Sequence, residues 1–152
     1  MTIRIEEISE HHFDELVEMF NEYRMFYRKE SDAAGAKKFL SERIRQSESV
    51  IYIAVAENNR AVGFIQLYPL FSSTRMKKWW LLNDLFVKPE WRDKGIGKLL
   101  IERCKALAMQ TKAGGLSLET EQNNLAGNHL YPQCGFELDT SHNFYSWENP
   151  MD

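Results

Sequence analysis

The sequence predicts a single mixed α/β domain that spans residues 1–152. Three observations support this fold class. Segments in which hydrophobic residues recur every three to four residues, as in helices, alternate along the chain with segments that have strand-like patterns. Hydrophobic residues make up 43% of the sequence, which is ample for a folded core in a chain of this length. No internal repeat, low-complexity tract or linker divides the chain.

The first half of the chain predicts two helices and three strands. Residues 2–8 alternate between apolar and polar side chains, as in a strand, and a helix follows that Ser9 can cap. A second helix is predicted over residues 32–47. The polar and aromatic residues 23–31 between the helices are expected to form a surface loop, or else the wall of a binding mouth. Two strand-like runs follow, residues 50–57 and residues 61–70. A turn separates them, and together they predict a β-hairpin.

The second half continues with an apolar strand over residues 79–87, which predicts a position covered on both faces of the sheet. A helix with one apolar stripe is predicted over residues 97–109. A short strand over residues 116–120 and a short helix over residues 125–133 come next. Residues 136–147 are expected to form a final pair of strands. The whole pattern predicts a sheet of six to seven strands with about four helices.

Composition disfavours several classes of function. The 19 basic and 22 acidic residues are scattered and give a net charge of −3, so no nucleic-acid partner is expected. The apolar runs are far shorter than the roughly 20 residues of a membrane-spanning helix, so no membrane association is expected. Cys104 and Cys134 lie in apolar contexts without metal-ligand spacing, and no secretory signal opens the chain. We therefore expect reduced thiols, no metal site and a cytoplasmic location.

The strongest local pattern is a buried strand, a turn containing Pro89, two glycines and an amphipathic helix. Gly95 and Gly97 let the backbone approach a ligand closely, and the N–H groups at a helix N-terminus attract an anion. Arg92, Lys94 and Lys98 add positive charge. Two glycines one residue apart are also common in plain loops, and the segment fits neither the dinucleotide fingerprint nor the P-loop.

Two ordered motifs make the chain resemble the GNAT superfamily of N-acetyltransferases. Arg92-x-x-Gly95-x-Gly97, between a strand and a helix, is similar to the family's acetyl-CoA-binding signature. The segment Asn124, Gly127 and Leu130-Tyr131-x-x-x-Gly135-Phe136 is similar to its second signature, although the family usually has alanine where this chain has Gly127. The resemblance implies a twisted, mostly antiparallel sheet, splayed between the strands at residues 79–88 and 115–120.

The resemblance also implies a site for acetyl-CoA as co-substrate. The backbone of Leu85, Phe86 and Val87 would bind the pantetheine arm as an added strand would. Asn124 would contact the cofactor, and Tyr131 would lie near its sulfur. The pyrophosphate would lie against the backbone of Arg92, Asp93, Lys94, Gly95, Ile96, Gly97 and Lys98.

The candidate catalytic residues are Tyr131, Asp84 and Asn83. The resemblance assigns Tyr131 as the proton donor, but proton transfer from a phenol to a thiolate is uphill by roughly 2 kcal/mol, so we expect it mainly to donate a hydrogen bond. Asn83 and Asp84 interrupt an apolar strand, either as satisfied structural groups or as residues that line the cleft. Polyamine acetyltransferases have Glu-Asp at this place, and asparagine cannot accept a proton. The proton acceptor is then Asp84, Glu119 or a water, or the substrate is a less basic amine.

The sequence thus predicts transfer of an acetyl group to a primary amine of a small molecule, by direct attack in a ternary complex. One alternative is a protein or peptide amine as acceptor. Another is a non-catalytic acyl-CoA-binding sensory domain, which the loss of a carboxylate at Asn83 keeps open. The aromatic C-terminal strand with Phe144, Tyr145 and Trp147 could pair across a homodimer interface or close the chain's own sheet.

Overall fold

The structure is a computed structural model that describes residues 2–152, and the chain divides into two compact units. The first unit extends to Glu119 and contains the sheet, whereas the second comprises residues 120–152. This division does not test the predicted single domain over residues 1–152, which stays a prediction. None of the helices within residues 2–152 combines the length and apolar character needed to cross a membrane.

The sheet of the first unit is mixed and mostly antiparallel, as predicted, with its strands in sequence order. Each strand pairs antiparallel with the next except the last pair, which is parallel. The strands are β1 (Arg4–Glu7), β2 (Val50–Val55), β3 (Ala61–Ser72), β4 (Lys77–Val87) and β5 (Leu116–Ser117). Residues 2–152 therefore contain five strands, and the predicted count of six to seven is wrong.

The difference arises at the C-terminal end of the chain. Residues 136–147, predicted to form a pair of strands, contain no helix or strand. The predicted strand at residues 116–120 is reduced to two residues, because β5 pairs with β4 only at Trp80↔Leu116 and Leu81↔Ser117. Beyond this short ladder the two strands separate, so the predicted splay is confirmed.

Within residues 2–152 there are four α-helices, as predicted, and two 3-10 turns, each of which precedes a helix. The α-helices are α1 (Phe13–Phe26), α2 (Ala33–Arg45), α3 (Ile96–Gln110) and, in the second unit, α4 (Leu125–Gln133); the turns are η1 (Glu10–His12) and η2 (Pro89–Trp91). Asp32 begins α2, because its side chain accepts a hydrogen bond from the N–H of Gly35 at 2.9 Å. The predicted loop over residues 23–31 begins late, since α1 continues to Phe26.

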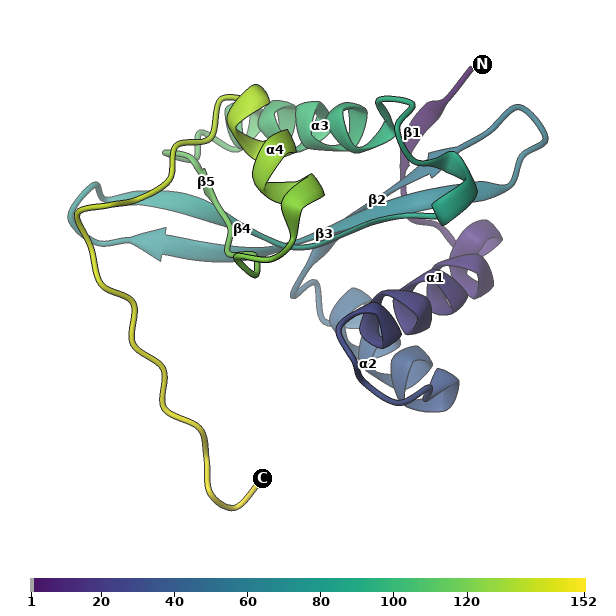
Figure 1. The fold of residues 1–152 in the computed structure, drawn as a ribbon, viewed down its shortest axis with the longest axis horizontal. Helices are drawn as coiled ribbons and strands as arrows, with labels where there is room; N and C mark the ends of the chain where they lie inside the picture. Colours follow the sequence, from purple (N-terminus) through teal and green to yellow (C-terminus); the bar gives the residue numbers. More distant parts are fainter. Residues whose placement is uncertain (1) are drawn as a thin grey trace. The chain divides into compact units, whose positions relative to one another are not determined.

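The helices of the first unit cover both faces of the sheet. In Figure 1, α1 and α2 lie on one face and α3 lies on the other. On the first face, α1 and α2 pack onto Ile51, Ile53 and Phe64 of the sheet, which are at most 1% exposed. The intervening Tyr52 points to the opposite face, where the guanidinium of Arg103 on α3 lies 4.5 Å from its ring centre. Because successive side chains of a strand point to opposite faces, neighbouring residues of β2 pack against the helices on the two sides of the sheet.

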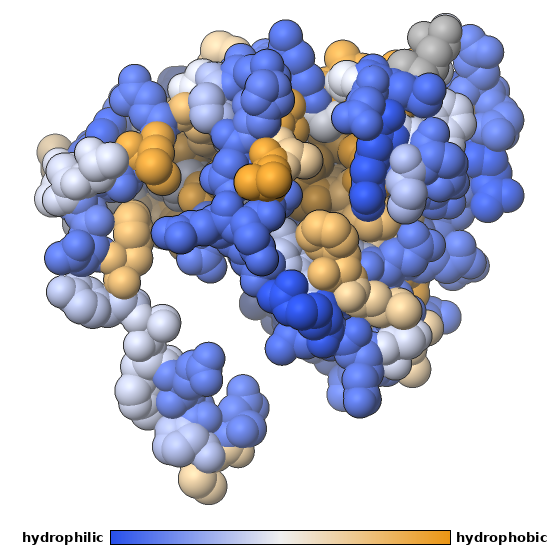
Figure 2. Space-filling model, viewed as in Figure 1, coloured by the Kyte–Doolittle hydropathy of each residue, from blue (hydrophilic) through white to orange (hydrophobic). Residues whose placement is uncertain are grey.

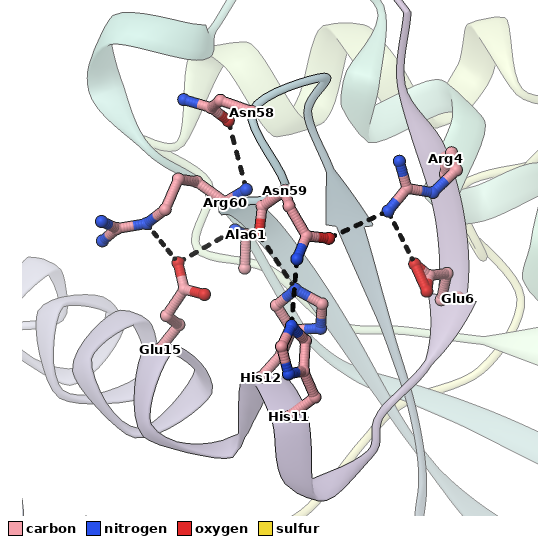
Figure 3. Close-up of polar contacts among 9 residues, drawn as sticks. All are labelled: Arg4, Glu6, His11, His12, Glu15, Asn58, Asn59, Arg60 and Ala61. Atoms are coloured by element: carbon pink, nitrogen blue, oxygen red, sulfur yellow. Dashed lines mark hydrogen bonds and ion pairs between the residues drawn. The ribbon is translucent and has the colours of Figure 1, made fainter.

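Polar contacts fix the turn between β2 and β3 to the start of the chain (Figure 3). The side chain of Asn59 accepts a hydrogen bond from Arg4 at 3.1 Å and donates one to His11 at 3.0 Å. Nε2 of the buried His12 lies 3.1 Å from the carbonyl oxygen of Asn59. Glu15 accepts hydrogen bonds from Arg60 and from the next backbone N–H. These bonds anchor the N-terminus of α1 to the sheet.

The loop between α3 and β5 passes so close to β4 that it requires a glycine at position 115. A Cβ atom on Gly115 would lie 2.7 Å from Cη2 of Trp79. We therefore expect Gly115→Ala to lower the free energy of unfolding by about 1–3 kcal/mol, measured by chemical denaturation. In a Trp79→Phe background the six-membered ring of the indole is absent and this cost should shrink. An equal cost in both backgrounds would contradict the steric explanation.

Candidate active site

A bulge in β4 lies at the centre of the candidate site. In the ladder with β3, Gln66 pairs with Asp84 and Leu67 pairs with Leu82, so Asn83 is an additional residue on β4. A bulge changes which backbone groups face the neighbouring strand. Before the bulge, the N–H of Trp80 points away from β3 and donates to the carbonyl of Gly115.

Along β4, backbone groups point alternately toward β3 and away from it. Because of the extra residue, even-numbered residues point away from β3 before the bulge and toward β3 after it. The N–H of Lys88 points toward β3, where it donates to the carbonyl of Val62 at 2.9 Å. Because the direction alternates along a strand, the backbone groups of Leu85 and Val87 point away from β3. The structure describes no strand on that side, since β5 pairs only with Trp80 and Leu81. We call Leu85 and Val87 the open edge of β4, and an extended ligand can bind there as a strand would.

The open edge leads to the N-terminus of α3. Gly95, the N-cap residue, has φ = 81°, a left-handed conformation that disfavours other residues, and no side chain caps the helix. A Cβ atom on Gly95 would meet no atom within 4 Å, so the space in front of the helix is open. The first backbone hydrogen bond that closes the helix comes from Leu99. The N–H groups before it are therefore available to an anion.

The charged residues around this helix end are consistent with an anionic ligand. Arg92, Lys94 and Lys98 are exposed, and Asp93 has φ = 61° in the turn before Gly95. The remaining predicted contact residues, Phe86 and Ile96, are buried, and only their backbone could meet a ligand.

Arg92 joins the helix end to the open edge of β4. Its Nε donates a hydrogen bond to the carbonyl oxygen of Val87 at 2.8 Å. Its guanidinium carbon lies 5.5 Å from the ring centre of Phe86 and 5.9 Å from that of Phe26 at the end of α1. Both distances are within the range of cation–π attraction. Arg92 therefore holds the turn against two other elements.

Asp84 is the buried charged group of the site, with 4% of its surface exposed. Its Oδ2 accepts a hydrogen bond from Nε2 of Gln66 at 2.7 Å, and its Oδ1 accepts one from Nδ2 of Asn83 at 3.1 Å. Burial raises the pKa of Asp84 above its ordinary value, although hydrogen bonds from Gln66, Tyr23 and Asn83 oppose this shift. Burial and the nearby charge of Asp84 also raise the pKa of Tyr68. The structure thus brings Asn83 and Asp84 together and gives Asp84 increased affinity for a proton.

Sequence reasoning missed Gln66, and it named Tyr23 only as part of a loop or of the wall of a binding mouth, without its contact with Asn83. Tyr23 on α1 donates a hydrogen bond to the carbonyl oxygen of Asn83 at 3.3 Å, so the end of α1 contacts the bulge directly. Gln66 was detectable in principle, since it is a single amide within the apolar run Ala61–Leu67 of β3. The position of Tyr23 has no local signal, because it is separated from Asn83 by 60 residues in sequence.

The second unit contains Asn124 and Tyr131 on either end of α4. Asn124 is the N-cap: its Oδ1 accepts a hydrogen bond from the N–H of Gly127 at 3.2 Å, and its Nδ2 donates to Thr120 at 2.9 Å. A Cβ atom on Gly127 would lie 2.6 Å from Nδ2 of Asn124. The glycine at this position, where the family usually has alanine, therefore leaves room for the capping side chain.

The end of α4 explains the Tyr-x-x-x-Gly-Phe part of the second motif. Gly135 has φ = 89° and follows the last residues of the helix. The N–H of Phe136 donates to the carbonyl oxygen of Tyr131 and that of Gly135 donates to Pro132, both at 3.0 Å, which is a Schellman motif. The rings of Tyr131 and Phe136 pack edge to face with centres 5.9 Å apart. The helix end thus orients the tyrosine.

Comparisons with known proteins agree with this geometry. A model of the Acetyltransferase (GNAT) family matches residues 6–136. An uncharacterized N-acetyltransferase, YhfO, from Bacillus subtilis (strain 168) is 48% identical over 132 residues, which cover 87% of this chain and 88% of the relative. The chain belongs to the GNAT acetyltransferase family.

Further relatives agree with this assignment. A probable acetyltransferase from Haemophilus influenzae is 32% identical over 81% of this GNAT chain and 82% of its own length. The crystal structure of a probable acetyltransferase superposes with a TM-score of 0.91 at 36% identity, covering 96% of this chain and 97% of that one. The protein is therefore an acetyltransferase.

GNAT acetyltransferases use acetyl-CoA as co-substrate, and the residues of this chain fit such a group. The uncapped N-terminus of α3 with open space at Gly95 suits a pyrophosphate, and the open edge of β4 suits an amide-containing arm. Among the described residues, no three His, Cys, Asp or Glu side chains gather into a group that could hold a metal ion.

Proposed function

We propose that this GNAT acetyltransferase moves the acetyl group of acetyl-CoA to a primary amine of a small molecule, by direct attack in a ternary complex. The observation that carries the proposal is the bulge at Asn83. The bulge lies between the part of β4 that pairs with β5 and the open edge of β4, and it is next to the buried carboxylate of Asp84. The open edge of β4, which begins at Leu85, is thus adjacent in sequence to Asp84, whose carboxylate can take a proton.

The reaction needs a neutral amine, because an ammonium group has no lone pair to attack the thioester. Deprotonation of a lysine-like amine at pH 7 costs about 4.6 kcal/mol, whereas an α-amino group costs about 1.4 kcal/mol. We propose Asp84 as the proton acceptor, directly or through a water, because its raised pKa increases its affinity for the proton. Asn83 cannot accept a proton, and its proposed role is to orient Asp84 through the 3.1 Å hydrogen bond.

The remaining roles are proposed for Asn124 and Tyr131 of the second unit and for the turn before α3. Tyr131 would donate a hydrogen bond to the thiolate that leaves, and Asn124 would contact the cofactor near the start of α4. The N–H groups and cations between Arg92 and Lys98 would bind the pyrophosphate. The match of one family model across residues from both units supports assigning them to a single acetyltransferase domain.

Tyr131→Phe tests the role of the hydroxyl group. We expect kcat to fall about 10- to 100-fold while the affinity for acetyl-CoA stays nearly unchanged, because one hydrogen bond to the leaving thiolate is lost in the transition state. Steady-state kinetics and calorimetric titration measure the two quantities. Phenylalanine preserves the ring packing on Phe136, so circular dichroism should show an intact fold. An unchanged kcat would exclude Tyr131 from the reaction.

An acceptor screen tests the proposed function. Release of free CoA is followed after acetyl-CoA is mixed with a polyamine, an aminoglycoside, amino acids with free α-amines and a lysine-containing peptide. Turnover with a small amine supports the proposal, and a preference for α-amines over lysine-like amines would favour a weakly basic acceptor. Turnover with the peptide alone would favour the protein-acceptor alternative. Saturable acetyl-CoA binding without turnover on any amine would favour the non-catalytic sensory alternative.

We also propose that the protein acts in the cytoplasm. Both cysteines are buried, and burial raises the pKa of the Cys104 thiol to about 12. Such thiols stay protonated and unreactive in a reducing compartment.

A further inference from the structure

Gln66 is a polar side chain in the interior of the first unit. Polar side chains gather at the surface on the face drawn in Figure 2, whereas Gln66 is 0% exposed and is the single polar side chain of the buried run Ala61–Leu67. Its Nε2 donates the 2.7 Å hydrogen bond to Oδ2 of Asp84, but its Oε1 has no hydrogen-bond partner among the described residues. Buried amide oxygens are rarely left without a partner, so this one requires an explanation.

The other groups around Asp84 suit its ionised form. Asn83 donates to Oδ1, and a hydrogen bond with Tyr23 of α1 also lowers the pKa of the carboxyl group. Tyr68 of β3 has its own pKa raised, first by burial and then by the charge of Asp84. Arg43 of α2 acts on Tyr68, but its guanidinium is paired with carboxylates on and just after its own helix. In the part of the chain that the structure describes, the partners of Asp84 are therefore neutral hydrogen-bond donors and include no cation.

Uptake of a proton changes what Asp84 needs from Gln66. The ionised carboxylate only accepts hydrogen bonds, whereas the protonated acid also has an O–H group that donates. If Oδ2 takes the proton, this O–H points at the N–H of Gln66, and two donors then face each other. Half a turn about the Cγ–Cδ bond of Gln66 exchanges its NH₂ group with its oxygen. The two groups have nearly the same shape and this torsion is two-fold, so both orientations fill the same space.

We propose that Gln66 is a positioning residue that supports both protonation states of Asp84: Nε2 donates to the carboxylate, and after proton transfer the amide turns so that Oε1 accepts from the new O–H group. The inference rests on the proposed role of Asp84 as proton acceptor. The proton leaves the nitrogen of the substrate ammonium, where the bonding electrons remain as the attacking lone pair, and it binds Oδ2 directly or through a water. Asp84 becomes neutral, and Gln66 is neutral throughout. The oxygen that lacks a partner beside the carboxylate thus gains one when the proton arrives.

An amide that turns affects proton transfer differently from a fixed one. A fixed N–H donor stabilises the carboxylate alone and therefore opposes the uptake of a proton. An amide that turns also stabilises the acid, through a weaker hydrogen bond because neither partner is charged. Gln66 thus holds Asp84 in one position before and after the transfer.

Infrared difference spectroscopy tests the turn directly. The protein is prepared with glutamine that carries ¹³C at the side-chain carbonyl, and spectra are recorded from neutral to acidic pH. We expect the labelled band of Gln66 to shift to lower frequency as Oε1 gains an O–H donor, with the same midpoint at which the carboxylic C=O band of Asp84 appears. The other four glutamines of the chain are exposed, so their bands should not follow this midpoint. Asp84→Asn should lack both changes.

The outcomes of this measurement separate the inference from the proposed function, and the wild-type protein carries it whether or not a variant folds. An Asp84 band that appears while the labelled glutamine bands stay constant would overturn the turning amide and leave Asp84 as the proton acceptor. If Asp84 takes up no proton before the protein unfolds in acid, its proposed role as proton acceptor is wrong, and the inference is wrong with it.

The pH profile of kcat/KM tests Gln66 during turnover. Gln66→Met preserves the approximate size of the side chain and removes both polar atoms. The decrease of kcat/KM in acid should move to higher pH by about one unit, because the lost hydrogen bond to the carboxylate is stronger than the one to the acid. The KM for acetyl-CoA should not change.

The matched control is Leu67→Met, which places the same side chain at the next buried position, on the opposite face of β3. Its pH profile should match that of the wild type. A Gln66→Met profile identical to the wild-type profile, together with an altered profile for Asp84→Asn, would overturn the role of Gln66 alone.

Discussion

Gly97→Trp is expected to raise the dissociation constant for acetyl-CoA about 100-fold or more. Gly97 is the second residue of α3, and Cα–Cβ bonds tilt toward the N-terminus of a helix, so the indole would lie over the uncapped N–H groups. Loss of two charge-assisted hydrogen bonds, at about 1.5 kcal/mol each, corresponds to this change. Calorimetric titration of acetyl-CoA into the variant and the wild-type protein measures it.

The matched control is Leu99→Trp. Leu99 lies on the same helix two residues later and is 43% exposed, so the same side chain is introduced away from the helix end. This variant should bind acetyl-CoA with nearly wild-type affinity. If both variants bind equally well, the N-terminus of α3 does not hold the pyrophosphate.

Asp84→Asn should lower kcat/KM about 100-fold, because it removes the proposed proton acceptor while it preserves the size of the side chain. The wild-type rate should fall as the pH falls through the raised pKa of Asp84, since only the carboxylate accepts a proton. The variant should lack this decrease. A pH profile of kcat/KM for both proteins measures the effect, and identical profiles would exclude Asp84 as the proton acceptor.

The raised pKa of Asp84 also predicts how the free energy of unfolding depends on pH, independently of the catalytic role. Between the ordinary pKa of an aspartate, near 3.8, and the raised value, the folded protein binds more protons than the unfolded chain. The contribution of Asp84 to stability is therefore greatest at low pH and is lost as the pH rises through the folded-state pKa. The unfolding free energy of the wild type should rise relative to that of Asp84→Asn on acidification. A constant difference across this range would mean that the pKa is not raised.

Local patterns predicted the elements whose formation depends on neighbours in sequence. The helices that Asp32 and Gly95 begin, and the hairpin around residues 58–60, carry their signals within a few residues. The end of α1 lacks such a signal. Its last turn follows Tyr23, whose ring packs edge to face against that of Phe64 of β3 with ring centres 5.9 Å apart, and this contact is not local in sequence.

Strand pairing and the hydrogen bonds around Asp84 also depend on residues that are distant in sequence, so local patterns do not predict them. The aromatic composition of residues 136–147 predicts a pair of strands but not the strands with which they would pair, and these residues form no strand in the described part of the chain. The two motifs and the polar pair Asn83 and Asp84 were visible in the sequence. The hydrogen bond from Gln66 was not, because it depends on the register of two strands across a bulge.

The bulge at Asn83 also divides β4 into two segments of opposite phase. Residues before it follow the alternation set by the hairpin turn, and residues after it follow the alternation in which Leu85 and Val87 face away from β3, where no described strand pairs with them. Because Asp84 pairs with Gln66 and Leu82 pairs with Leu67, which are neighbours on β3, deletion of Asn83 would leave a regular ladder with both pairs intact. The residue is thus an insertion that the register of β3 accommodates, and its loss would remove the local bend and additional twist of β4 rather than the pairing of the strands.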